Sequence, residues 1–153
     1  MAGNIFVAGT TTESLLASSS EKTLIRITTP SSASIKIKEW GVFFDGVSVT
    51  AEPVVVKVMA SGTTETGMTS HTPIRRNARI TASQCVVQTL GTSCCALDSS
   101  GIYCIREVHP QSGYQEKFAF GDEIVVSGTS GTIAIHVNSP SSVYVIAEMV
   151  YEE

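Results

Sequence analysis

The chain has 153 residues, a length that suits one domain of ordinary size and is short for two. Its formal net charge is −4, and ten lysines and arginines cannot supply the basic face that a general nucleic-acid binder needs. No apolar run approaches the about 18 residues of a membrane-spanning helix, and the N-terminus lacks the basic start and apolar core of a signal peptide. We therefore expect a domain that binds neither nucleic acid nor membrane and that is used without secretion through the general export route.

The first 20 residues combine a short apolar patch with a Ser/Thr-rich stretch. This composition predicts a flexible N-terminal arm over residues 1–20, followed by a single domain over residues 21–153. Such an arm could order on binding, with Ile5 and Phe6 as contacts to a partner.

Strand signals follow at regular intervals after the arm. The strongest spans residues 35–45. Its alternating apolar residues occupy odd-numbered positions up to Ile37 and even-numbered positions from Trp40 onward. This change across Glu39 predicts a β-bulge, and it places Trp40 in the core. The other predicted strands span residues 22–29, 53–60, 84–90, 102–108, 117–120, 123–127, 132–138 and 142–151.

The apolar composition agrees with these strands. The chain contains 17 valines and 13 isoleucines against 5 leucines, and β-branched side chains fit a pleated sheet better than a helix. Eight or nine short strands without a convincing helix indicate an all-β fold: an antiparallel β-sandwich or jelly-roll-like arrangement, or a small barrel. The pattern does not separate these architectures.

A long Gly- and Thr-rich loop is predicted over residues 61–83, and it carries Arg75, Arg76 and Arg79. These arginines have two interpretations: a solvated loop, or docking to an acidic surface through bidentate ion pairs. The acidic C-terminal end offers the opposite charge, so a contact between subunits is a further hypothesis.

Four cysteines, Cys85, Cys94, Cys95 and Cys104, follow the spacing C-x8-C-C-x8-C. Zinc sites usually have paired ligands two to four residues apart, which this spacing lacks. Neighbouring residues on a strand also point to opposite faces. Reduced, buried thiols are therefore favoured over disulfides formed after lysis and over a metal site.

The sequence offers no pattern that supports catalysis. The three histidines, His71, His109 and His136, are far apart and have no metal-ligand spacing. There is no nucleophile elbow and no phosphate-binding loop. Adjacent carboxylates such as Asp122–Glu123 diverge on a strand and are interpreted as solvated charges. We expect no catalytic residue, no metal and no cofactor.

Four segments carry a resemblance to a known family: IKIKEWGVFFDGVSVTAEPVVVKV (35–58), REVHPQSGY (106–114), GDEIVV (121–126) and VYVIAEMVYEE (143–153). They are similar to the small decoration, or cement, proteins of tailed-phage capsids. The resemblance implies a non-enzymatic virion protein, assembled in the host cytoplasm, that binds the major capsid protein on the capsid surface as a homotrimer where capsomers meet. Residues 61–105 depart from this pattern, which leaves the docking residues open.

Two other functions fit an all-β binding module. One is a structural module of a phage tail or head fibre, which differs in its position on the virion. The other is a carbohydrate-binding β-sandwich, but such modules stack sugars on exposed aromatic rings, and Trp40 is predicted to be buried.

Overall fold

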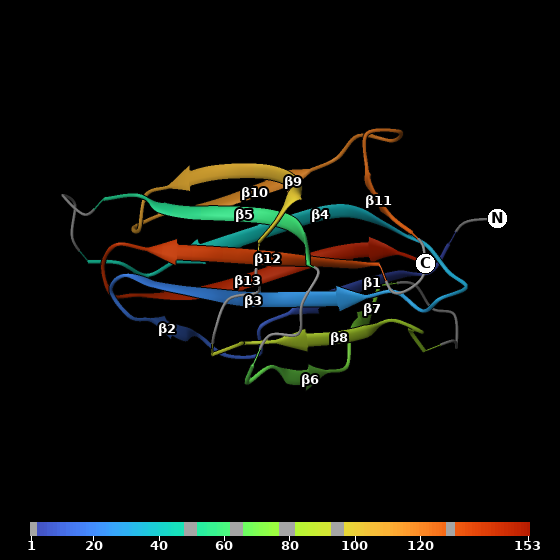
Figure 1. The fold of residues 1–153 in the computed structure, drawn as a ribbon, viewed down its shortest axis with the longest axis horizontal. Coiled ribbons are helices and arrows are strands. Elements are labelled where there is room, and N and C mark those ends of the chain that lie inside the picture. The colour runs from blue at the N-terminus through green and yellow to red at the C-terminus, as the bar shows by residue number, and fades with distance from the viewer. Residues whose placement is uncertain (1–2, 48–51, 62–65, 77–81, 93–96, 128–130) are drawn as a thin grey trace.

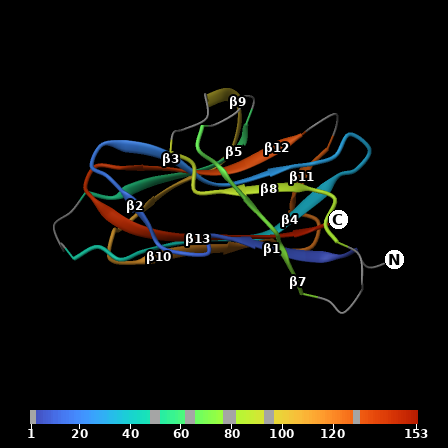
Figure 2. The same ribbon diagram turned by 90° about the horizontal axis from the view of Figure 1, so that it is seen from below.

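The computed structural model describes residues 3–47, 52–61, 66–76, 82–92, 97–127 and 131–153. Within these ranges the regular structure is entirely β, with thirteen strands in two antiparallel sheets (Figure 1). Figure 2 shows the two sheets edge-on, packed face to face as layers of a β-sandwich. The predicted fold class is confirmed, whereas the predicted count of eight or nine strands was too low.

The first sheet, sheet A, is built around β4 and β13. Its strands in spatial order are β10 (Gly113–Lys117), β4 (Ile35–Phe44), β13 (Val143–Glu152), β1 (Ile5–Gly9) and β7 (Ile74–Arg75). The short strand β11 (Ile124–Val126) pairs with β4 next to β10, and β2 (Ser14–Leu16) pairs with β13 next to β1.

The second sheet, sheet B, is built around β3 and β12. Its strands in spatial order are β6 (Thr69–His71), β8 (Val86–Thr89), β3 (Ser20–Thr28), β12 (Thr132–Ser139), β5 (Val54–Ser61) and β9 (Leu97–Val108). Sequential strands often lie in different sheets, so the chain crosses repeatedly between the two layers.

The core lies between the sheets and is made by the inward-facing residues of both. β5 shows the alternation most simply, because Val54, Val56 and Val58 are fully buried. The largest buried side chains are Trp40 and Tyr151 of sheet A. Burying an aliphatic or aromatic side chain of this kind contributes about 1.5–3 kcal/mol. The predicted core position of Trp40 is confirmed.

The predicted bulge lies in β4. Ile37 and Trp40 both face the core. They are three residues apart, a spacing that would place them on opposite faces of a regular strand. The pairing register with β13 shifts at the same place, since Val150 lies opposite Glu39 and Tyr151 lies opposite Ile37. The extra residue lets both halves of β4 present their apolar residues to one core.

The predicted N-terminal arm is corrected by the structure. Residues 5–9 and 14–16 form β1 and β2, and β1 pairs with β13 from Ile5 opposite Glu152 to Gly9 opposite Glu148. Phe6 is 1% exposed, and its ring stacks on Tyr151 with centroids 5.6 Å apart. An apolar stretch this short is stabilised by pairing with the far end of the chain, which its composition alone does not reveal.

Two further expectations about strands were wrong. The strand predicted at residues 117–120 is displaced, because residues 113–117 form β10 and the chain turns after Phe118. The predicted loop over residues 61–83 contains the strands β6 and β7. Strands of two or three residues are too short to show an alternating pattern.

An arginine joins the two sheets where their edges meet. β9 of sheet B leads into β10 of sheet A, and Arg106 on β9 reaches across to β10. Its Nε–H donates to the Tyr114 hydroxyl (2.8 Å), and its guanidinium pairs with Glu116 (2.9 Å). The guanidinium also lies 5.4 Å from the centroid of the Tyr114 ring.

Candidate interaction surface

The segments that carry the family resemblance are neighbours in the fold. Each segment contributes one strand to sheet A: β4, β10, β11 and β13, of which the last three each pair directly with β4. The first segment also includes residues 54–58 of β5, and the second includes residues 106–108 of β9, both in sheet B. The turns beyond β4 and before β10 also meet, because the Gly46 N–H donates to the Pro110 carbonyl (2.7 Å). A Cβ at residue 46 would lie 2.5 Å from that carbonyl oxygen, so the approach requires glycine.

The outer face of sheet A carries four apolar side chains that are 39–47% exposed. This sheet A patch consists of Leu15, Phe43, Tyr144 and Ile146. Its members are cross-strand neighbours, since Tyr144 lies opposite Leu15 and Ile146 lies opposite Phe43. The outward face of an antiparallel sheet is normally polar, and an exposed apolar cluster is typical of an interaction surface.

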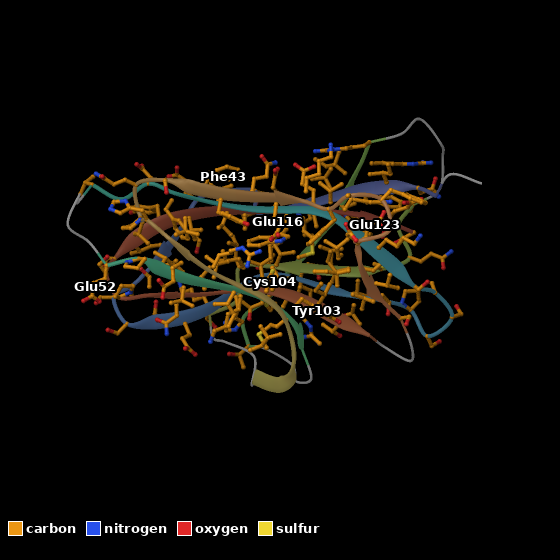
Figure 3. All side chains as sticks on the ribbon, turned by 90° about the horizontal axis from the view of Figure 1, so that it is seen from above. Phe43, Glu52, Tyr103, Cys104, Glu116 and Glu123 are labelled. Carbon is orange, nitrogen blue, oxygen red and sulfur yellow. The ribbon has the colours of Figure 1, made fainter. Side chains whose placement is uncertain are left out.

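Phe43 is held in place by two glycines. Gly113 lies directly opposite Phe43 on β10, and the phenyl ring covers the space that a side chain at Gly113 would occupy. A Cβ at Gly41 would lie 3.3 Å from the same ring. Figure 3 shows Phe43 on the outer side of sheet A, whereas Glu116 and Cys104 lie between the layers. The ring therefore needs little ordering when a partner binds.

A shallow hollow opens beside the sheet A patch. Its volume is about 130 Å³, and its lining residues are Glu13, Phe43, Phe44, Asp45, Tyr144, Val145 and Ile146. The hollow is smaller than the about 300–1,000 Å³ of a small-molecule pocket. Engineered apolar cavities of about 150 Å³ in other proteins hold a benzene molecule, so a hollow of this size suits one apolar side chain.

The outer face becomes polar beyond the sheet A patch. The Gln115 side-chain amide donates to the carboxylates of Glu39 and Glu148, at 3.3 Å for Glu148. Arg76 reaches to 3.8 Å from Glu39, and its side chain remains 52% exposed. One end of this face is thus apolar and the middle is charged.

The residues predicted as partner contacts do not form one cluster. Phe6 lies in the core, which leaves its ring no surface for a partner, and Ile5 is half-buried. Arg75 donates to the Asn4 side chain (3.4 Å), and Arg76 pairs with Glu39. Arg79 lies outside the described residues.

The sheet A patch was missed, although the sequence carries a local signal for its residues. Phe43 and Phe44 are adjacent, and Tyr144 and Ile146 alternate with buried residues, so β4 and β13 are apolar on both faces in these stretches. That doubled apolar pattern is the signal that could have been used.

A lysine on β4, a glutamate on β13 and the glutamate just before β11 form an ion-pair cluster. The Lys38 amine lies 2.8 Å from Glu123 and 2.7 Å from Glu152. The hydrogen bond from Lys38, followed by backbone N–H donors, lowers the pKa of Glu123 to about 2. The same pairs raise the pKa of Lys38. The interpretation of Asp122–Glu123 as solvated charges was therefore wrong for Glu123.

The C-terminal residue anchors the segment before β8. The Glu153 side chain accepts hydrogen bonds from the backbone N–H groups of Gln84 and Cys85 (both 3.2 Å) and from the Ser83 hydroxyl. The Ser83 hydroxyl also lies 2.8 Å from the Tyr151 hydroxyl. This network is structural, because it joins the end of sheet A to the entry into sheet B.

The two described cysteines are free thiols in environments that disfavour reaction. Burial, followed by the nearby Glu153 carboxylate, raises the pKa of Cys85 to about 12. Burial also raises the pKa of Cys104. Since the thiolate is the nucleophilic form, neither thiol is activated. Cys94 and Cys95 lie outside the described residues.

Metal-binding clusters and membrane-spanning helices are both absent from the described ranges. No group of three or more His, Cys, Asp or Glu side chains is placed to hold a metal ion there. The same ranges contain no helix with the length and apolar character of a membrane span.

Neither family models, curated proteins nor solved structures gave a match to this chain. The family resemblance in the sequence and the partners it implies therefore stay predictions.

Proposed function

We propose that this protein is a structural virion component that binds the outer surface of a phage capsid and stabilises it, using the outer face of sheet A. One observation carries the proposal. Each of the four segments that resemble decoration proteins contributes a strand to sheet A around β4, and the outward side chains of β4 and β13 supply three of the four residues of the sheet A patch. The resemblance is thus concentrated in the sheet that carries the exposed apolar surface, although it also includes residues 54–58 of β5 and 106–108 of β9 in sheet B.

The physical properties of this face suit binding to a protein assembly. Aromatic side chains near the centre of an interface often supply most of its binding free energy, and Phe43 and Tyr144 are exposed and set in a rigid sheet. A stable interface buries about 800 Å² on each partner, which is more than four partly exposed side chains provide. A trimer would multiply such weak contacts through effective concentration.

The alternative functions differ in what they require of the surface. A tail or head-fibre module could use the same face, so only its position on the particle distinguishes it. A carbohydrate-binding module would stack sugars on exposed rings; Trp40 is 0% exposed, so such a module would have to use other rings, such as Phe43 and Tyr144. No observation favours sugar binding over protein binding.

The proposal can be tested with capsids that lack their decoration protein, from the phage whose virion contains this chain. The wild-type protein is expected to co-sediment with these capsids and to occupy their surface in cryo-electron micrographs. Phe43→Ala or Ile146→Ser should weaken binding by roughly tenfold or more, as for a hot-spot residue. Ile105→Ser is the matched control, because Ile105 is similarly exposed at the other sheet.

Two results would contradict the proposal. Density for the protein on the tail alone would place it elsewhere on the virion. If Ile105→Ser weakens capsid binding as much as the sheet A variants do, the outer face of sheet A is not the binding face.

A further inference from the structure

The hollow beside the sheet A patch combines an apolar floor with an acidic rim. Phe43, Tyr144 and Ile146 provide the apolar part, and Glu13 and Asp45 provide two carboxylates. Neither carboxylate belongs to an ion pair within the described part of the chain. Both charges are therefore available to a partner.

The acidic character extends along the strands that carry the hollow. Glu148 follows Ile146 on the outward side of β13, and Glu39 lies further along β4. On the other side of the patch, the Lys22 amine donates to the Leu15 carbonyl (2.7 Å) and keeps its positive charge. Glu39 is already paired with Arg76. The charge preference therefore comes from Glu13 and Asp45 at the hollow, which favour a positively charged partner and disfavour an acidic one.

The size of the hollow limits the kind of occupant. At about 130 Å³ it accepts one side chain and not a drug-sized ligand. The glycines beneath Phe43 fix one wall before binding. A side chain presented by a protein surface fits these constraints better than a free small molecule.

We propose that the hollow binds an apolar side chain of a protein partner, and that lysine or arginine residues flank this side chain and pair with Glu13 and Asp45. The inference deepens the proposed function, on which it rests for the partner's identity as a capsid protein. The chemistry of the partner follows from the hollow itself.

A second copy of this chain is the alternative occupant. Ile74 is 69% exposed and is followed by Arg75 and Arg76, so the chain carries an apolar residue beside basic ones. Both arginines, however, contact their own sheet: Arg76 lies 3.8 Å from Glu39 and Arg75 lies 3.4 Å from Asn4. These contacts favour a separate protein as the partner.

The first test uses three short peptides and the full-length ¹⁵N-labelled protein in NMR titrations. The peptides are acetyl-Gly-Arg-Phe-Arg-Gly-amide, the same peptide with glutamates in place of the arginines, and the same peptide with serine in place of phenylalanine. We expect saturable shifts at Phe43, Tyr144 and Ile146 with the first peptide only. Equal binding of the acidic peptide, or no saturable shift with the first peptide, would overturn the inference.

The second test measures the charge contribution in the same assay. Glu13→Gln and Asp45→Asn should each weaken binding of the arginine peptide by roughly two- to fivefold, as expected for exposed charge pairs. Added salt should weaken wild-type binding more than it weakens binding to the double variant. Glu107→Gln, an exposed carboxylate on β9, is the matched control. Unchanged melting temperatures would show that the variants fold.

Two outcomes separate this inference from the proposed function. Peptide binding without capsid binding would overturn the capsid proposal and leave the inference standing. If Ile146→Ser abolishes capsid binding but both charge variants leave capsid binding unchanged, the inference is overturned and the capsid proposal stands. If light scattering shows an oligomer that Ile146→Ser dissociates, a second copy fills the hollow, and the inference is overturned.

Discussion

At the scale of single residues, Trp40 shows how packing and hydrogen bonding contribute separately to stability. The side chain is fully buried, with its ring centroid 5.3 Å from that of Tyr114. Its indole N–H has no hydrogen-bond acceptor in the described part of the chain. The tryptophan therefore stabilises the core by packing alone, and leaving its N–H without an acceptor costs about 1–3 kcal/mol.

Replacing Trp40 should separate these two effects. We expect Trp40→Phe to lower the free energy of unfolding by roughly 1–2 kcal/mol, because it loses packing but no hydrogen bond. Trp40→Ala should lower it by about 3–5 kcal/mol. Urea unfolding followed by circular dichroism measures both variants. A phenylalanine variant as unstable as the alanine variant would mean that the indole N–H has an acceptor.

The ion pair between Glu123 and Lys38 predicts a dependence of stability on pH. The pKa of Glu123 is about 2 in the folded protein, against 4.5 for a free glutamate. The folded state therefore binds the proton more weakly, and the pair stabilises the fold above pH 4.5. This contribution is lost as the pH falls from 4.5 towards 2.

The measurement compares the wild-type protein with Glu123→Gln in urea titrations across this pH range. We expect the loss of stability on acidification to be smaller in the variant. Part of the loss of stability on acidification should remain in Glu123→Gln, because Lys38 also lowers the pKa of Glu152. Lys38→Met removes the shared partner and should flatten the profile further. Parallel profiles for all three proteins would contradict the assignment.

At the scale of secondary-structure elements, β1 is a strand of sheet A and part of the core. Phe6 and Ala8 are buried, and β1 lies between β13 and β7. We expect Phe6→Ala to cost about 3–5 kcal/mol of stability, as for other buried aromatic residues. Thr11→Ala, at an exposed position just after β1, should change stability by less than about 0.5 kcal/mol.

The burial of Phe6 and the pairing of β1 with β13 also determine what a deletion of the N-terminus would do. Removing residues 2–20 would delete β1 and β2 and expose the edge of β13, so loss of capsid binding by that variant would reflect unfolding. Equal stability of Phe6→Ala and the wild-type protein, measured by urea unfolding, would restore the hypothesis of a separate arm.

The sequence predicted those elements whose signal is local. The bulge at Glu39 could be predicted because the parity of apolar residues changes within β4. β10 was misplaced because Phe118 and Phe120 suggested a strand where the chain turns, and Phe120 is almost fully exposed. Which strands share a sheet depends on contacts between distant segments, such as that between β1 and β13. The sheet A patch depends on those same pairings, so the doubled apolar pattern of β4 and β13 could indicate its residues but not that they lie together.

At the scale of the whole molecule, the two sheets share one core. Residues from both sheets contribute to a single hydrophobic cluster, which contains Trp40 of sheet A and Ile135 of sheet B. Arg106 adds a polar link between the sheet edges through Tyr114 and Glu116. Neither sheet can bury its apolar face without the other, so neither is expected to fold alone.

This shared core predicts a single cooperative unfolding transition. Trp40 is the one tryptophan of the chain, so its fluorescence reports on sheet A. Cys85 precedes β8 of sheet B, and burial raises the pKa of its thiol to about 12, so it should react with thiol reagents only after unfolding. In a variant with the other three cysteines changed to serine, the urea midpoints from fluorescence and from thiol reactivity should coincide. Arg106→Lys should shift both midpoints together to lower urea, by about 1 kcal/mol in free energy, because a single amine cannot replace both the Nε–H bond to Tyr114 and the Nη2 contact with Glu116. Reaction of Cys85 at urea concentrations where Trp40 fluorescence is still native would show that sheet B opens by itself, and the two layers would then be separate cooperative units.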